Sequence, residues 1–230
     1  MLSSIEKRPL FLTILISLFI LLSTITIIFP DFSHMTQPSI GTKPHSVLEL
    51  AGRQIYIKEG CIACHSQLVR PLKNETDRYG KYSISGEYAF ERPSLFGSSR
   101  LGPDLLRVGN YRTTQWHEKH MYNPQSVAKN SIMPSYKHMF SKRADIETAW
   151  AVAYTNRKIF NVPYNRAIIQ DDGSKRTVKL ASSVLEAKKE ALIEAKKIVY
   201  EMENADVKKA LHANEIPEIV AIIAYLNSLR

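Results

Sequence analysis

The sequence predicts an all-α protein in which a single N-terminal transmembrane helix precedes one helical domain. Two observations support this prediction. Residues 10–29 form one uncharged apolar run, and apolar residues recur at helical spacing near both ends of the remaining chain, over residues 47–58 and 217–229. With 230 residues, 44% of them hydrophobic, the chain can bury one sizeable core with an appended subdomain.

The apolar run over residues 10–29 is long enough to cross a bilayer. A helix of this length measures about 30 Å, which is the thickness of the hydrocarbon core. A cleaved signal peptide is the alternative, but its apolar region usually has about 7–15 residues and ends in a small-residue cleavage site. This run ends Ile-Ile-Phe-Pro-Asp, without such a site. We therefore predict an uncleaved membrane anchor.

The charges around the anchor predict its orientation. Lys7 and Arg8 precede the run and Asp31 follows it. Because positive charge favours the cytoplasmic side, residues 1–9 are predicted to be cytoplasmic and the remainder to lie outside. In a bacterium this places the domain in the periplasm, on a single-pass anchor in the inner membrane.

A linker and two helices are predicted next. Residues 30–46 contain three prolines and a glycine with little apolar period, as in a linker between membrane and domain. The domain then spans residues 47–230. Its first helix covers residues 47–58 and ends before Gly60, and its last covers residues 217–229 and opens with a proline.

Gly52 lies inside the first predicted helix, where glycine costs about 1 kcal/mol relative to alanine if exposed. The missing side chain is useful if another helix approaches closely. We expect the first and last helices to pack together, with Tyr225 as the neighbour of Gly52.

Cys61, Cys64 and His65 form the pattern Cys-x-x-Cys-His, the attachment signature of a c-type haem. The two thiols add to the porphyrin vinyl groups, and the adjacent histidine becomes the proximal ligand of the iron. A zinc half-site, a thioredoxin-like redox pair and a structural disulfide are the alternatives. Zinc usually needs about four ligands from two paired clusters, and a redox pair does not require His65. The sequence has 2 cysteines, so we predict one covalently bound haem c.

The charge balance does not indicate a nucleic-acid partner. The chain has 31 Lys and Arg against 22 Asp and Glu, a net charge of +9. The cations are interleaved with acids and form no run longer than two residues, which is unlike a nucleic-acid footprint. An acidic protein partner fits the excess better.

Motifs across the domain resemble the small all-α cytochrome c fold. They are Gly-x-x-x-Tyr-x-x-x-Gly-Cys-x-x-Cys-His over residues 52–65, Gly-Pro-Asp-Leu over residues 102–105, Met133-Pro134, and Ile-Ala-Tyr-Leu-Asn-Ser-Leu over residues 223–229. In that family the first and last helices cross near the haem. The resemblance implies that the Pro103 carbonyl accepts a hydrogen bond from His65, which fixes the tautomer of the proximal histidine.

The iron needs a sixth ligand, which is a methionine or a second histidine. The resemblance favours Met133, because a proline following the ligand holds an irregular loop extended in that family. The alternatives that stay open are Met139, Met121, His117, His120 and His138. A methionine ligand raises the reduction potential, as suits a carrier near the oxygen end of a respiratory chain.

Residues 66–101 are a long loop insertion for a minimal cytochrome domain. They mix cations, acids and aromatic residues without a helical or strand period. A loop of this length is usually functional or disordered, and its aromatic and glycine content argues against disorder. We expect it to dock onto a partner subunit.

The insertion and the motifs after it resemble the membrane-anchored mono-haem subunit of the cbb-type cytochrome c oxidases, the C family of haem-copper oxidases. The motifs are residues 66–87, residues 97–105, Trp116-His117, Asn123-Pro124 and residues 131–136. The likeness covers the anchor and residues 47–140. It departs at Phe96 and Ser99, where that family often has tryptophan and lysine.

The resemblance implies an electron carrier within an oxidase. Electrons pass from a cytochrome c donor, often through a di-haem cytochrome c subunit, to this subunit and then to the catalytic haem-copper oxidase subunit. That complex reduces oxygen and translocates protons, and this chain alone only carries electrons. The alternative is an anchored mono-haem cytochrome serving another reductase, such as nitric oxide reductase.

Arg70, Arg78 and Arg100 are candidates for contacts with haem propionates or with another subunit, because guanidinium groups pair bidentately with carboxylates. Solvated surface arginines are the alternative. Residues 141–215 match the family loosely and are predicted to be a helical addition. Ser183 and Glu186 predict a capping box for an amphipathic helix within it.

Overall fold

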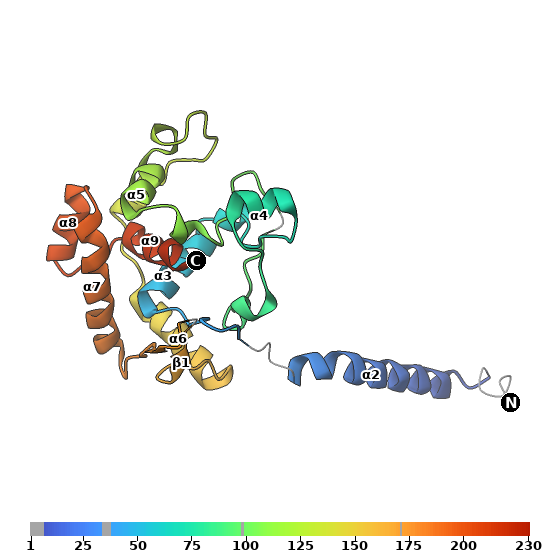
Figure 1. Cartoon of the computed structure of the whole chain (residues 1–230). Coiled ribbons are helices and arrows are strands. Elements are labelled where there is room, and N and C mark those ends of the chain that lie inside the picture. The colour runs from blue at the N-terminus through green and yellow to red at the C-terminus, as the bar shows by residue number, and fades with distance from the viewer. Residues whose placement is uncertain (1–6, 34–37, 98, 171) are drawn as a thin grey trace.

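The computed structural model describes residues 7–33, 38–97, 99–170 and 172–230. These residues are mostly helical, so the predicted fold class is confirmed (Figure 1). The α-helices are α2 Pro9–Ser33, α3 Val47–Lys58, α4 Lys73–Tyr79, α5 Thr114–Tyr122, α6 Ile146–Ile159, α7 Val184–Glu201, α8 Ala205–His212 and α9 Glu218–Ser228. Short 3₁₀ turns cover Cys61–Ala63, Ser85–Tyr88, Val108–Asn110, Pro124–Ser126 and Lys137–Phe140.

Helix α2 extends away from the domain (Figure 1). Over Pro9–Ile27 it is long and apolar enough to cross a membrane, and none of that segment is buried against the rest of the chain. The helix indicates a single-pass membrane anchor. Residues 1–6 of the predicted cytoplasmic segment lie outside the described residues.

The linker is shorter than the predicted 30–46. Helix α2 continues past Pro30 and ends at Ser33, within one turn of this proline. Proline has no backbone N–H group, so one hydrogen-bond donor is missing near the helix end. On the other side, the Ser39 amide donates to the Gly86 carbonyl at 3.1 Å, and the Gly41 amide donates to the Ile169 carbonyl at 3.2 Å. Residues 39–42 are therefore held on the domain surface.

Helix α3 has the predicted bounds, and its start is capped on both sides. The Ser46 hydroxyl accepts from the Glu49 amide, while the Glu49 carboxylate accepts from the Ser46 amide. This capping box satisfies two backbone donors at the helix start. Helix α9 begins at Glu218, with Pro217 in the position before its first turn.

Helices α3 and α9 cross at the centre of the domain (Figure 1). A Cβ on Gly52 would lie 1.9 Å from the carbonyl oxygen of Ala221 and 2.8 Å from Cβ of Tyr225. The predicted contact of Gly52 with Tyr225 is confirmed, and the Ala221 backbone comes closer still. Tyr225 and Tyr56 pack edge to face with centroids 5.7 Å apart, and both are fully buried.

Residues 141–215 form a layer beside the crossed helices. Helix α7 buries Ala187, Ala191, Ala195 and Val199 against the domain, at the spacing that the sequence predicts. Its capping box is incomplete. The Ser183 hydroxyl accepts from the Glu186 amide at 3.3 Å, but the Glu186 carboxylate accepts from Ser182.

This layer also contains a β-hairpin that the sequence analysis missed. Strands β1 Ala167–Ile169 and β2 Lys175–Thr177 pair antiparallel, with Ile169 opposite Lys175. Gly173 adopts a φ of 79°, which the turn requires and which glycine adopts at little cost. The signal was the pair Asp172-Gly173, a strong hairpin turn sequence.

The described part of the insertion over residues 66–101 is not wholly irregular. It contains helix α4, with Lys73 paired to Asp77 at 2.7 Å one helical turn later. Val69 is fully buried and Glu75 is 3% exposed. The segment is thus packed as part of the domain. The contacts that hold it join residues distant in the sequence, so no periodic pattern reveals them.

A buried ionic cluster joins the start of α3 to the insertion. His45 Nε2 lies 2.6 Å from Glu91 Oε1, and Arg53 Nε lies 2.7 Å from Glu91 Oε2. His45 Nδ1 also lies 3.4 Å from Glu49 Oε2. Burying such a cluster costs desolvation free energy. Losing one partner strongly destabilises the fold, because the remaining charge is then buried without a partner.

The pKa of His45 makes stability depend on pH. Burial alone would lower this pKa, but Glu91 and Glu49 raise it from 6.5 to about 9. Because the folded pKa exceeds the unfolded one, the stabilisation is complete below pH 6.5 and is lost as the pH rises through about 9. The pKa of Glu91 is about 2, against the opposing effect of burial, so its contribution holds above pH 4.5.

We expect the Tm to fall between pH 6.5 and about 9 and the His45→Gln variant to lose most of this slope. Circular dichroism melts at stepped pH measure it. If the Tm of the variant changed with pH as steeply as that of wild type, His45 would have the same pKa in the folded and unfolded states.

Candidate haem-binding site

A cavity of about 330 Å³ lies beside the Cys-x-x-Cys-His motif. Five of the predicted site residues line it, namely Cys61, His65, Arg78, Pro103 and Met133. Most of the other wall residues are apolar or aromatic and come from α3, α5, α9 and the segment around Val108: Tyr56, Leu105, Val108, Tyr111, Trp116, Met121 and Leu226. An apolar wall with a few polar groups is typical of a cofactor site.

Cys61 begins a 3₁₀ turn directly after α3. Gly60 takes a φ of 72° and redirects the chain, and the His65 amide donates to the Cys61 carbonyl at 2.9 Å. Cys61 is buried, and Cys64 is half-buried. Both cysteines are free, so they form no disulfide in this structure. Burial raises the pKa of Cys61 to about 12, which disfavours the thiolate that redox exchange requires.

His65 is oriented from two sides. Its Nδ1 lies 2.8 Å from the Pro103 carbonyl oxygen, which can only accept, so Nδ1 carries a proton. Burial lowers the pKa of His65, although Pro103 opposes the shift, and the neutral ring keeps its lone pair on Nε2. A Cβ on Gly102 would lie 2.3 Å from Cε1 of the ring, so the imidazole rests directly on this glycine. The result is a histidine prepared for metal coordination.

Asp104 holds the chain after the motif, and sequence reasoning missed it. Its carboxylate accepts from the Ser66 hydroxyl at 2.7 Å, from the Leu68 amide at 2.8 Å and from the Leu106 amide at 2.9 Å. The side chain is fully buried. Asp104 therefore positions the residue that follows His65. Its place inside the Gly-Pro-Asp-Leu motif was the signal that could have identified it.

The candidate sixth ligands fall into two groups, those that line the cavity and those that do not. Met133, Met121, His117 and His120 line the cavity. Met139 is fully buried in the hydrophobic core and is not among the lining residues. The remaining candidate, His138, is not among the lining residues, and its Nε2 lies 3.0 Å from Glu59 Oε2.

Two ring nitrogens of this cavity lack partners among the residues that the structure describes. These are Nε2 of His117 and Nδ1 of His120, both buried. Burial lowers both pKa values to about 4, so both rings are neutral. A buried polar atom without a partner costs about 1–3 kcal/mol, so these atoms fit a cavity that holds a polar group or water. Together with His65 Nε2, the donor set fits a haem.

The three predicted arginines lie in different places. The guanidinium groups of Arg70 and Arg100 both reach the buried Glu75 carboxylate, Arg100 Nη1 at 2.8 Å. Arg78 lines the cavity, with its guanidinium carbon 5.3 Å from the centre of the Tyr79 ring. Of the three, Arg78 alone borders the cavity.

Arg112 also lines this cavity and was not predicted. Its guanidinium carbon lies 4.3 Å from the Trp116 ring, and that ring stacks on His120 with centroids 4.4 Å apart. An arginine placed over an indole gains cation–π attraction. No local sequence pattern marked Arg112, because the stack forms only when α5 and the preceding turn pack together.

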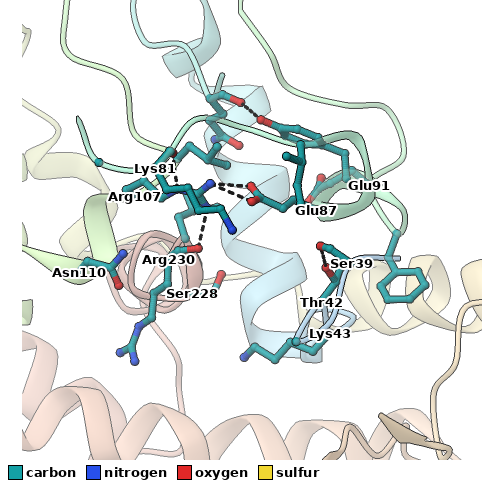
Figure 2. Close-up of a pocket in the computed structure, with 18 of the residues that line it drawn as sticks. Ser39, Thr42, Lys43, Lys81, Glu87, Glu91, Arg107, Asn110, Ser228 and Arg230 are labelled. Atoms are coloured by element: carbon teal, nitrogen blue, oxygen red, sulfur yellow. Dashed lines mark hydrogen bonds and ion pairs between the residues drawn. The ribbon is translucent and has the colours of Figure 1, made fainter. Parts of the chain in front are cut away.

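A second cavity, of about 1110 Å³, lies between residues 39–45, the insertion and the C-terminus (Figure 2). In Figure 2 Arg107 reaches both the Glu87 carboxylate and the Arg230 carbonyl. The Arg107 Nη2 atom lies 2.8 Å from Glu87 Oε2. This cavity is larger but contains neither cysteine and not His65, so the smaller cavity remains the candidate haem site.

The fold and the smaller cavity define a class of protein, a helical haem protein carried on an apolar N-terminal helix. The family follows from comparison with known proteins. Residues 2–230 match the family described as "Cytochrome C oxidase, mono-heme subunit/FixO". The chain belongs to this family and is therefore a cytochrome c oxidase subunit that carries one haem. No curated protein sequence matches the chain.

Proposed function

We propose that this chain passes electrons through one covalently bound c-type haem within a cbb-type oxidase. The observation that carries the proposal is that Cys61, His65 and Met133 border one cavity in a member of this family. The electrons come from a cytochrome c donor or a di-haem subunit. They pass to the catalytic haem-copper subunit, which reduces oxygen to water. The domain lies in the periplasm of a bacterial inner membrane.

Each residue of the proposed cofactor site has its own role. Cys61 and Cys64 would attach the porphyrin through thioether bonds, and His65 Nε2 and the Met133 sulfur would hold the iron. When bound, the haem supplies one-electron chemistry between ferric and ferrous iron. The Pro103 carbonyl keeps the proton on Nδ1 of His65, which makes Nε2 the donor and increases its basicity. Arg78 and Arg112 line the cavity and would pair with the propionates.

Met133 is preferred over Met121 because of where each lies. Met121 is on helix α5 and is buried in the core. Met133 is on an irregular segment, its amide donating to the Ser131 hydroxyl at 3.2 Å, and a loop can bring the thioether to the iron.

We expect Met133→Leu to abolish the thioether charge-transfer band near the red end of the ferric spectrum and to lower the potential, because methionine stabilises ferrous iron. Met121→Leu is the matched control and should keep both. A reversed result, with the band lost only in the Met121 variant, would assign the ligand to Met121.

Exposed apolar side chains beside the cavity provide a docking surface. Ile132 is 80% exposed and precedes Met133, and Leu101 is 67% exposed and lies two residues before Pro103. Apolar contact at the centre of an interface excludes water and brings redox centres close. Leu72 and Tyr82 on the insertion are exposed as well and extend the surface available to the catalytic subunit.

Ile132→Glu is expected to reduce electron transfer through the complex by about tenfold, because one buried interface side chain is typically worth more than about 1 kcal/mol. The visible spectrum should not change. Ile193→Glu, on α7 and 60% exposed, is the matched control and should transfer electrons at the wild-type rate. Stopped-flow reduction of the b-type haem by cytochrome c, which passes through this subunit, measures both. Equal rates in the two variants would exclude Ile132 from the contact.

Purification in mild detergent tests the assembly itself. The tagged full chain should bring down a complex that contains copper, b-type haem and c-type haem, and this complex should consume oxygen with a cytochrome c donor. A complex with b-type haem but without copper would instead indicate a nitric oxide reductase. A chain that purifies alone would indicate a free-standing anchored cytochrome.

A further inference from the structure

Three metal-ligating side chains meet outside the haem cavity. Glu59 follows the last turn of α3, His138 lies in the 3₁₀ turn Lys137–Phe140, and Glu218 opens α9. One donor atom from each lies within 4.8 Å of the other two. Over the described ranges, no other group of three such residues converges in this way, and this one includes neither cysteine.

One carboxylate oxygen of the cluster is left without a hydrogen-bond partner. His138 Nε2 lies 3.0 Å from Glu59 Oε2. Glu218 Oε1 lies 2.7 Å from Lys58 Nζ, while Glu218 Oε2 has no partner within the described part of the chain. The Glu218 side chain is only 6% exposed. A buried carboxylate oxygen without a partner costs free energy, so the cluster lacks a positive or donating group.

A salt bridge to Lys58 is the simpler explanation of the cluster, but it is incomplete. Lys58 is 57% exposed, so its ammonium is solvated and its long side chain is free to move away. It reaches one oxygen of Glu218 and leaves the other unsatisfied. A divalent cation beside both carboxylates and the imidazole would satisfy all three residues together.

We infer that Glu59, His138 and Glu218 form a binding site for a divalent transition-type cation, for which Zn²⁺ is the suitable probe. One imidazole nitrogen and two carboxylate oxygens are a donor set that zinc accepts, with its fourth position open to water. Ca²⁺ takes 6–8 oxygen ligands and Mg²⁺ prefers oxygen, so both fit poorly. His138 is 37% exposed, which gives the ion access from solvent.

The site would connect three separate parts of the domain. Its ligands belong to the end of α3, the start of α9 and the turn that follows the Met133 segment. A bound ion would hold that segment against the two crossed helices. The inference does not depend on the proposed function, because none of the three residues lines the haem cavity.

Equilibrium dialysis against radioactive Zn²⁺ tests the site on the full chain, with haem attached and in detergent. Wild type should bind one ion more than Glu218→Gln or His138→Gln, with affinity reduced on the order of 100-fold in each variant, because even outer partners of a metal site contribute 10–100-fold. Glu215→Gln and His212→Gln are matched controls outside the cluster and should bind as wild type. Ca²⁺ and Mg²⁺ at equal concentration should not compete.

Lys58→Met gives a test that does not weaken the ligands. Lys58 competes for Glu218, so its removal should tighten Zn²⁺ binding several-fold and increase the rise in Tm that Zn²⁺ produces. Zinc that binds equally to wild type and to Glu218→Gln would overturn the inference, as would weaker binding to Lys58→Met. Circular dichroism confirms that each variant is folded before binding is measured.

Discussion

Cys61→Ser and Cys64→Ser variants are expected to lose haem staining in a denaturing gel. Only a covalently attached haem stays with the chain once the fold is lost, and in the proposed site stable attachment needs a thioether bond from each cysteine. Cys61 is buried at the wall of the cavity. Peroxidase staining of membrane fractions, normalised to the chain by immunoblot, measures the effect.

Met133→Leu provides the control for this experiment. It alters the proposed axial ligand but leaves both thioether bonds, so its staining in the denaturing gel should equal that of wild type. Full staining of either cysteine variant would contradict covalent attachment at the motif. Loss of staining in all three variants would show that the gel reports chain stability and not attachment.

Gly52→Val is expected to unfold the domain or lower its stability by more than about 3 kcal/mol, the upper range of ordinary overpacking. A Cβ at this position would lie 1.9 Å from the backbone oxygen of Ala221. A backbone atom cannot rotate away, so α3 and α9 would have to separate. The gain in helix propensity from replacing glycine, at most about 1 kcal/mol, is too small to compensate.

Thermal melts and haem yield measure this effect, and Gln54→Val provides the comparison. Gln54 lies in the same helix and is only half-buried, so its replacement tests the cost of valine in a helix without the close contact. We expect a Tm change of only a few degrees for Gln54→Val. Comparable losses in both variants would show that helix propensity matters more than the contact with Ala221.

The parts that the sequence predicted well are encoded by local patterns. The anchor follows from an uncharged run, and the bounds of α3 follow from Ser46, Glu49 and the apolar period between them. The close packing at Gly52 was predictable because a helix interior has no other use for glycine. The structure places the Pro103 carbonyl beside His65, where resemblance to a known fold predicted it.

The parts that the sequence did not predict depend on contacts between distant residues. Glu75 is buried only because Arg70 and Arg100 meet it, and no spacing in the sequence indicates that meeting. The insertion therefore looked irregular although it is packed. The cluster of Glu59, His138 and Glu218 is a further case, since its members are separated by 79 and 80 residues (138 − 59 and 218 − 138).

The hydrogen bonds that hold residues 39–42 on the domain limit how far the haem can move from the membrane. Helix α2 ends at Ser33, and the six residue steps to Ser39 span at most about 20 Å when fully extended. The domain is therefore confined to a thin layer next to the bilayer. A partner anchored in the same membrane is confined to the same thin layer, so the two proteins meet in a much smaller volume than two soluble proteins would.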